Sequence, residues 1–221
     1  MGKNTPMTIF FTSDLHFNHK AMVRDTTTGE PGWRPFDTLD DLNRTIIDRW
    51  NSVVEDNDIV YVLGDVCMGK RTDTLPLVRE LAGTKFLIPG NHDNCWEGLI
   101  YPQVIPEVQA KQRAKVDGWR EKYLELGGFE DILPSQVRVT LISPAGTHMD
   151  FDLCHFPALG PREGDDRYPW AYPPISETYN IHGHTHEPYR LHDGNQIHIG
   201  VDAWDFTPVS TGQIFDLIYV P

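Results

Sequence analysis

In the first half of the chain, two kinds of apolar pattern follow each other in turn. Three short, mostly apolar runs end in polar residues, which predicts strands buried in a sheet. Two intervening segments carry apolar residues at steps of three or four, the spacing of one helix face. The predicted strands are 8–14, 58–65 and 85–93, and the predicted helices are 37–54 and 74–83.

The second half begins with another helical pattern and then changes to strands. Apolar residues recur on one face between residues 107 and 126, and two glycines follow as a helix stop. The later predicted strands are 136–143 and 149–156, which form a hairpin, then 179–184, 196–203 and 213–220. This order predicts one domain over 1–221 with an α/β core, mixed sheets and outer helices. We expect a helical insertion at about 101–131 and a Pro/Gly-rich active-site rim at about 157–176.

Composition constrains function more than it constrains the fold. No apolar run approaches the ~18 residues of a membrane span, and the N-terminal segment lacks the apolar core of a signal peptide. The 3 cysteines are an odd, sparse set, which favours a reducing compartment over a disulfide framework, and they form no CxxC pair, which argues against a thiolate zinc finger. We therefore expect a cytoplasmic protein with no membrane partner. The net charge of −13 repels long polyanions and favours a small phosphate ester as substrate.

Residue types that bind metals stand where five of the predicted strands end. Because such strand ends meet at one edge of an α/β sheet, we expect these side chains to converge. The candidates are Asp14, His16, Asp65, Asn91, His155, His184 and His186. Asp14 and His16 are two positions apart, so an extended backbone would point both the same way, and His184 and His186 share that spacing.

The chemistry of this set indicates the kind of ion. Imidazole mixed with oxygen ligands, without thiolate, suits Zn, Mn or Fe. The set is too large for one tetrahedral ion, so it predicts two ions that share a bridging carboxylate.

The ordered motifs D-x-H, G-D, G-N-H-D, a single H and G-H-x-H resemble the calcineurin-like metallophosphoesterase superfamily. In this chain they begin at Asp14, Gly64, Gly90, His155 and Gly183. The segments FTSDLHFNHKAMV, RPF and HIGVDAWDFTPVS further resemble a small single-domain branch of bacterial and phage members. The resemblance implies a four-layer α/β-β/α sandwich, the metallo-dependent phosphatase-like fold.

The resemblance also implies a role for each motif residue. One ion would be held by Asp14, His16 and His186, the other by Asn91, His155 and His184, with Asp65 bridging them. A hydroxide between the ions would attack phosphorus, and His92 would protonate or stabilise the leaving oxygen. The candidate catalytic residues are therefore His92, Asp65 and Asp14, with Asn91 and His92 also contacting substrate. Two divalent Mn, Fe, Zn or Ni ions would serve, with Mn favoured in vitro.

Several neighbouring residues have two interpretations. Arg34 can bind a phosphate bidentately or form a loop salt bridge. His19 can contact substrate, but Asn18 replaces the glycine usual in the branch, which favours a structural role. Asp202 and Asp93 are expected to brace the site, and we expect His182 to pack beside it.

Together these features predict a metal-dependent phosphoric ester hydrolase. We favour a phosphodiesterase acting on small nucleotides or nucleic-acid ends, with a phosphomonoesterase (phosphatase) as the alternative. A non-catalytic scaffold of the same fold is a weaker alternative, because no motif residue is missing.

Overall fold

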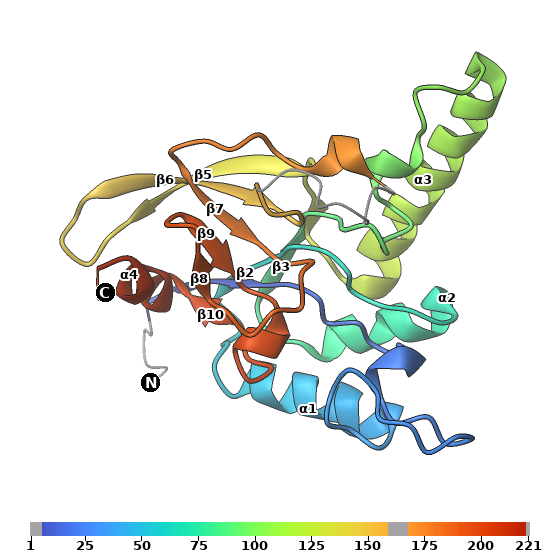
Figure 1. Cartoon of the computed structure of the whole chain (residues 1–221), viewed down its shortest axis with the longest axis horizontal. Coiled ribbons are helices and arrows are strands. Elements are labelled where there is room, and N and C mark those ends of the chain that lie inside the picture. The colour runs from blue at the N-terminus through green and yellow to red at the C-terminus, as the bar shows by residue number, and fades with distance from the viewer. Residues whose placement is uncertain (1–5, 159–167, 220–221) are drawn as a thin grey trace.

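The computed structural model describes residues 6–158 and 168–219, which form two five-stranded sheets packed against each other (Figure 1). The first sheet has the order β10-β1-β2-β3-β4, in which β10 alone is antiparallel to its neighbour. Its strands are β1 (Ile9–Thr12), β2 (Ile59–Val62), β3 (Thr84–Leu87), β4 (Asp131–Ile132) and β10 (Val209–Ser210).

The second sheet has the order β5-β6-β7-β9-β8. Its members are β5 (Gln136–Ile142), β6 (His148–Cys154), β7 (Tyr179–His182), β8 (Leu191–His192) and β9 (Gln196–His198). The expected hairpin is confirmed, because β5 and β6 pair antiparallel from Gln136↔Cys154 to Ile142↔His148. Strands β6, β7 and β9 run parallel, so this sheet is also mixed.

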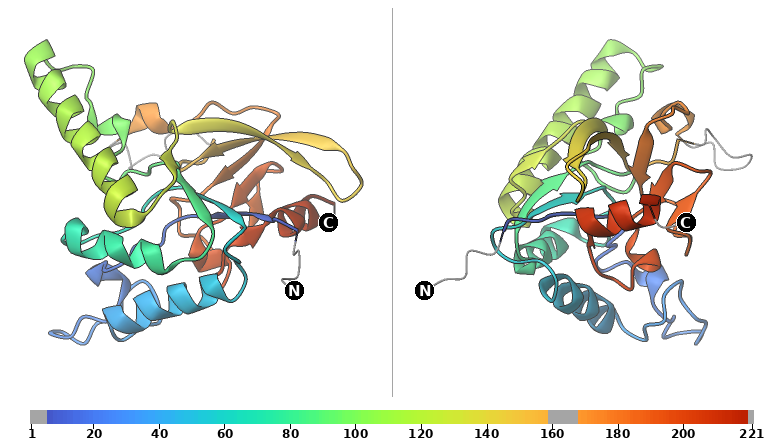
Figure 2. Two further views of the ribbon diagram at one scale, coloured as in Figure 1. Left: turned by 180° about the vertical axis from the view of Figure 1, so that it is seen from behind. Right: turned by 90° about the vertical axis from the view of Figure 1, so that its left-hand side faces the viewer.

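The helices are α1 (Leu39–Asn51), α2 (Arg71–Thr74), α3 (Pro106–Gly127) and α4 (Thr211–Tyr219). The Thr38 hydroxyl accepts a hydrogen bond from the backbone N–H of Asp41 at 3.1 Å, so α1 begins at the expected cap. Helix α3 ends at Gly128, which adopts φ 68° and caps its C-terminus. Figure 2 shows α3 leaning away from the sheets, with its far end standing clear of the body.

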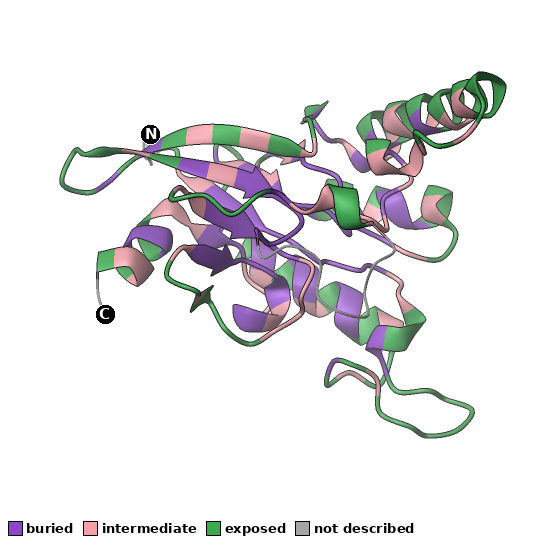
Figure 3. Ribbon diagram, turned by 45° about the horizontal axis from the view of Figure 1, so that its top comes forward, coloured by how far each residue is buried: buried purple, intermediate pink, exposed green. Residues whose placement is uncertain are grey.

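Two hydrophobic cores fill the space around the first sheet. One lies between this sheet and the helices, where Ile46 and Trp50 of α1 and Tyr123 of α3 are buried. The other lies between the two sheets and includes Phe11 and Phe151. Burial is therefore concentrated on the strands, while the outer end of α3 is largely exposed (Figure 3).

The mixed α/β architecture with two sheets is confirmed, but two predicted elements differ. Only α2 and a following 3₁₀ helix (Leu75–Glu80) cover the predicted helix 74–83, in a stretch that contains Pro76, which lacks an N–H to donate.

The prediction of a strand at 213–220 is wrong, because residues 213–219 belong to α4 and residue 220 lies outside the described residues. The Ser210 hydroxyl accepts from the Gln213 N–H, and the Gln213 side chain accepts from the Ser210 N–H. This reciprocal capping box starts a helix, and burial of Ile214 and Phe215 holds it against the inter-sheet core. None of the helices within the described ranges has the length and hydropathy needed to cross a membrane.

Candidate metal centre

The predicted ligands lie on five loops, which follow β1, β2, β3, β6 and β7. Backbone hydrogen bonds join the first two loops, from Asp14 N to Gly64 O at 3.1 Å and from His16 N to Asp65 O at 2.9 Å. The loop after β7 is joined to that after β6, since the Gly183 N–H donates to His155 O at 3.1 Å. The expected convergence of strand ends is therefore present in the structure.

Left-handed backbone turns, rather than extended strands, aim these ligands. Asp14, His16, Asp65, His184 and His186 have φ between 52° and 70°. This region is uncommon for residues with a side chain and costs of the order of 1–3 kcal/mol per residue. The expectation that extended spacing aligns Asp14 with His16, and His184 with His186, is therefore wrong, although each of these residues does face the site.

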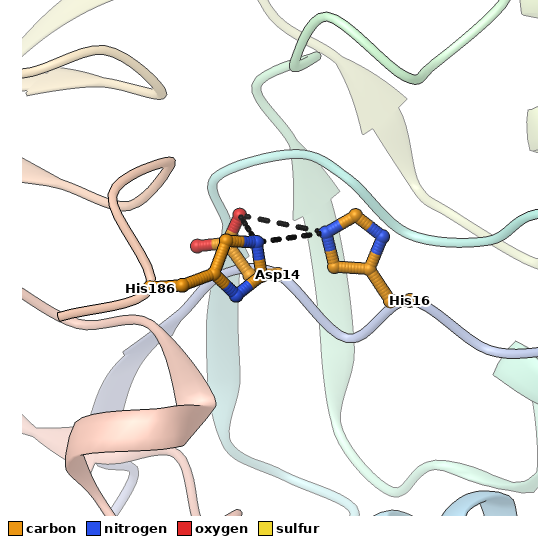
Figure 4. A group of neighbouring side chains, drawn as sticks. All are labelled: Asp14, His16 and His186. Carbon is orange, nitrogen blue, oxygen red and sulfur yellow. Dashed lines mark hydrogen bonds and ion pairs between the residues drawn. The ribbon is translucent and has the colours of Figure 1, made fainter. Parts of the chain in front are cut away.

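The first group of ligands consists of Asp14, His16 and His186 (Figure 4). The Nε2 atoms of His16 and His186 are 3.1 Å apart. Both face Oδ1 of Asp14, at 4.0 Å from His16 Nε2 and 3.8 Å from His186 Nε2. The three ligand atoms point at one common position, as ligands of a single ion do.

The second group surrounds the Nε2 atom of the fully buried His155. Asn91 Oδ1 lies 3.0 Å from this nitrogen and His184 Nδ1 lies 3.3 Å from it. Asp65 Oδ1 is 3.5 Å away. This arrangement agrees with the assignment of Asn91, His155 and His184 to one ion.

Asp65 lies between the two groups. Its Oδ2 is 3.6 Å from His16 Nε2, and its Oδ1 is the atom near His155. Burial raises the pKa of Asp65 to about 7, although the nearby His155 acts to lower it. A cation at either group would favour the ionised carboxylate, as a bridging ligand requires.

Hydrogen bonds to Nδ1 fix which nitrogen His155 and His186 present to the site. His155 Nδ1 lies 2.7 Å from the Leu63 carbonyl oxygen, and His186 Nδ1 lies 2.8 Å from Asp202 Oδ2. Each Nδ1–H donates outward, so each Nε2 lone pair faces the ligand group. Burial acts to lower the pKa of His186, but the hydrogen bond to Asp202 and the charges of Asp14 and Asp202 together outweigh it, so the pKa is raised.

The residues present fit divalent cations on two further observations. Asp14 Oδ1 is fully buried and has no hydrogen-bond partner among the described residues, which is costly unless a cation satisfies it. The glycines of the motifs leave room for this packing, because a Cβ on Gly90 would fall 2.4 Å from Asp65 Oδ1, and one on Gly183 would fall 2.3 Å from Asp14 Oδ2.

His92 and His19 lie at the solvent side of the ligands. His92 Nε2 is 3.9 Å from Asp65 Oδ2, and the side chain is 38% exposed. His19 Nδ1 is 3.1 Å from His16 Nδ1. Burial, reinforced by His155, lowers the pKa of His92, and burial together with His92 lowers that of His19 to about 4.

Arg34 does not face the site as a phosphate ligand, and the expected substrate-binding role is corrected here. Its side chain is 1% exposed and pairs with Asp202 through Nε at 2.7 Å. Its terminal nitrogens donate to the carbonyl oxygens of Leu15 and Asp14 at 2.9 and 2.6 Å. The salt-bridge alternative therefore holds, and Arg34 fixes the Asp202 carboxylate that orients His186.

Two further contacts support the loops, and only one was expected. Asp93 braces the site as predicted, accepting from the N–H groups of Asp65, Val66 and Gly90 at 2.8, 3.1 and 2.9 Å. The hydroxyl of Tyr123 on α3 also donates to Asp93, at 3.0 Å. The sequence places Tyr123 on the apolar stripe of the helix, and nothing in that stripe indicates a buried acceptor.

Arg71 also escaped prediction, because no motif marks it. Its guanidinium donates to the His92 carbonyl oxygen at 2.7 Å, and its Nε is buried without a hydrogen-bond partner in the described residues. Arg71 contributes to the lowered pKa of both His92 and His19. A cation therefore stands beside the two histidines at the mouth of the site.

Part of the expected rim, residues 159–167 with Arg162 and Arg167, lies outside the described residues. Its described part includes Tyr172, whose hydroxyl lies 3.3 Å from His184 Nε2. The rim thus reaches a predicted ligand through Tyr172.

A sheet pair whose strand ends carry these aspartate, asparagine and histidine ligands defines a metal-binding phosphoesterase fold. The chain belongs to the calcineurin-like phosphoesterase family, whose sequence profile matches residues 7–188. The resemblance drawn from the motifs is thereby confirmed. Family membership supports metal-dependent hydrolysis of phosphate esters.

Relatives of similar length come from phages. The chain is 32% identical over 219 residues to the gene 66 protein of Mycobacterium phage L5, covering 95% of this chain and 93% of that one. It is 26% identical over 208 residues to the gene 66 protein of Mycobacterium phage D29, covering 91% and 92%. These relatives fit the expected small phage and bacterial branch.

A solved structure supports the fold. The protein of unknown function AQ665 from Aquifex aeolicus superposes with a TM-score of 0.56 at 21% identity, covering 96% of this chain and 100% of that one. This likeness concerns architecture alone.

Proposed function

We propose that this protein is a dinuclear-metal phosphodiesterase acting on small nucleotides or nucleic-acid ends. The observation that carries the proposal is the position of Asp65, whose Oδ2 is 3.6 Å from His16 Nε2 and whose Oδ1 is 3.5 Å from His155 Nε2, beside the buried, unpartnered Oδ1 of Asp14. Asp14, His16 and His186 would hold one ion, and Asn91, His155 and His184 the other. Bound ions supply positive charge to the phosphoryl oxygens and acidify water; we favour manganese for assays.

The charges of the chain's own residues support a diester over a monoester. A phosphodiester carries one negative charge, whereas a monoester carries nearly two at neutral pH. Arg34 is engaged by Asp202, which leaves Arg71, whose guanidinium donates to the His92 carbonyl oxygen, as a positive charge beside His92 in the described part of the chain. One such cation beside the ions suits the singly charged ester.

His92 is placed to serve the leaving oxygen. Its imidazole is partly exposed beside Asp65, so an ester can reach it. Its lowered pKa favours the neutral ring, whose N–H can still donate a hydrogen bond to the departing oxygen. The neighbouring Asn91 is a proposed metal ligand and also lies at the mouth of the site, where it can contact the substrate.

Hydrolysis of bis-p-nitrophenyl phosphate with added Mn²⁺ tests the proposal. We expect turnover that is lost with chelator and reduced by about 10²–10³-fold in His92→Ala, as for the loss of a transition-state donor. Absence of turnover with Mn²⁺, Ni²⁺, Zn²⁺ and Fe²⁺ in folded protein contradicts hydrolysis altogether. A much faster reaction with p-nitrophenyl phosphate contradicts the diesterase preference and favours the phosphatase alternative.

A further inference from the structure

Trp33 is the most exposed of the large apolar side chains in the described residues, with 76% of its surface accessible. A single exposed tryptophan needs no explanation by itself. This one, however, lies against a metal ligand: its ring centroid is 6.0 Å from that of His186, with the ring planes at 77°. Most of the indole surface therefore remains open to solvent beside the candidate metal centre.

The backbone holds Trp33 firmly in this place. Its N–H donates to the Ala21 carbonyl oxygen at 3.1 Å, and that of Arg34 donates to Met22 O at 2.9 Å. Arg34 is further fixed by its ion pair with Asp202. On the other side, Gly32 lies so close to Val23 that an added Cβ would fall 2.4 Å from its backbone.

The loop that carries Trp33 is closed at its base. The Arg24 guanidinium pairs with Asp37 at 2.8 Å, and the Arg24 N–H donates to Phe36 O at 2.9 Å. Figure 1 shows this loop in blue, beyond the end of α1. An exposed indole on a fixed backbone is preorganised for contact, because little ordering is needed when a partner binds.

The rings beside Trp33 give its position relative to the reacting group. His186 is followed by His16 at 4.9 Å between centroids, and His16 by His92 at 5.4 Å. The rings of His186 and His16 thus connect Trp33 to His92 by successive contacts. If His92 serves the leaving oxygen, the indole is left for the ester group that stays on phosphorus.

We infer that Trp33 forms a stacking subsite for a planar ring, such as a nucleobase, on the retained ester group of the substrate. Tryptophan offers a large aromatic face and stacks on bases largely without regard to their sequence. The inference rests on the proposed phosphodiesterase function and deepens it, since it names the substrate group that this end of the site recognises.

Two esters with the same leaving group test the subsite. The p-nitrophenyl ester of thymidine 5′-monophosphate and methyl p-nitrophenyl phosphate differ only in the group retained on phosphorus. We expect Trp33→Ala to lower kcat/KM for the thymidine ester about tenfold, the loss of one stacked base. The kcat/KM of Trp33→Ala for the methyl ester should fall by less than about twofold. Trp33→Phe should keep most of the activity on both esters.

Tyr219→Ala is the matched control, because Tyr219 is an exposed aromatic residue at the end of α4. It should leave both esters unaffected. An equal loss on both esters in Trp33→Ala shows that Trp33 acts by positioning His186, and no loss on either shows no subsite; each result overturns the inference.

A binding measurement separates the inference from the proposed function. In metal-chelated protein, thymidine 5′-monophosphate should quench tryptophan fluorescence in the wild type and in Trp119→Phe, which removes a tryptophan on α3. The quenching should disappear in Trp33→Phe, and its persistence there overturns the inference. Wild-type quenching without hydrolysis of either ester, by contrast, contradicts the proposed function and leaves the ring-binding subsite standing.

Discussion

Two clusters of histidines lie on either side of Gly183, and within the described residues only one of them contributes to groups that could hold a metal ion. The front cluster is His16, His155, His184 and His186. The rear cluster is His182, His192 and His198, in which the Nε2 atoms of His182 and His192 are 3.1 Å apart. The Nε2 atoms of His16 and His186 in the front cluster are separated by the same distance. Residue type, burial and nitrogen spacing therefore do not distinguish the two clusters.

The carboxylates distinguish them. Burial acts to lower the pKa of His155, but Asp65 and Asp14 outweigh it and raise the pKa. In the rear cluster burial prevails, and the pKa of His198 is lowered. Both ring nitrogens of His198 lack a hydrogen-bond partner in the described residues. Asp14 and Asp202 also act to raise the pKa of His198, but they do not compensate for its burial as the carboxylates around His155 do.

Asp65→Asn should have the largest effect, because it removes a carboxylate charge that distinguishes the front cluster from the rear cluster. The change removes the shared charge, while asparagine tolerates the left-handed backbone that Asp65 adopts at φ 55°. We expect kcat/KM to fall by about 10³-fold or more. Bound manganese, measured by elemental analysis, should fall below that of the wild type. Unchanged manganese content and activity contradict the assignment of Asp65 as a bridge.

Asp202→Asn should weaken the front cluster less. This carboxylate accepts from His186 Nδ1 and pairs with the buried Arg34, so its loss leaves the ring orientation unsupported. The expected cost is about 10–100-fold in manganese affinity, followed by titrating activity against free Mn²⁺. Asp205→Asn is the matched control, since Asp205 is 75% exposed in its pair with Arg49. Equal effects of the two changes contradict an orienting role.

His198→Leu should make the rear cluster less sensitive to acid, although the buried His182 remains. A folded-state pKa below that of the unfolded chain means that stability is present above about pH 6.5 and is lost as the pH falls. Urea unfolding in chelator, at pH 7.5 and 5.5, should show a loss of stability in the wild type that is smaller in the variant by about 1 kcal/mol or less. His148→Gln, an exposed position on β6, controls for histidine number. A variant as acid-sensitive as the wild type contradicts burial of a neutral His198.

Tyr123→Phe should produce the smallest change, and only in the front cluster. It removes one of the donors to Asp93, whose other hydrogen bonds to Asp65, Val66 and Gly90 remain. We expect a loss of about 1 kcal/mol in the free energy of unfolding and a few-fold fall in kcat. The acid sensitivity attributed to His198 should be unaltered. A wild-type kcat would show that α3 does not support the site.

The ligands could be predicted because each follows a strand, and strand ends are readable from short apolar runs. Their local conformation could not, since a left-handed turn at His184 depends on the Asp14 carboxylate accepting its N–H at 3.0 Å. The direction of Arg34 likewise depends on Asp202, which is far away in sequence. The helix at 211–219 differs, because the Ser210–Gln213 capping box starts it, whereas the apolar run that follows predicts a strand.

The brace formed by Asp93 has a consequence for how the protein acquires its metal. The hydrogen bonds that join the loops after β2 and β3 are made by the protein alone, from three backbone N–H groups and Tyr123. A folded chain can therefore load, release and exchange ions without rebuilding those loops. Its metal content will then follow the supply around it, and one purified preparation can be reconstituted with several metals in turn.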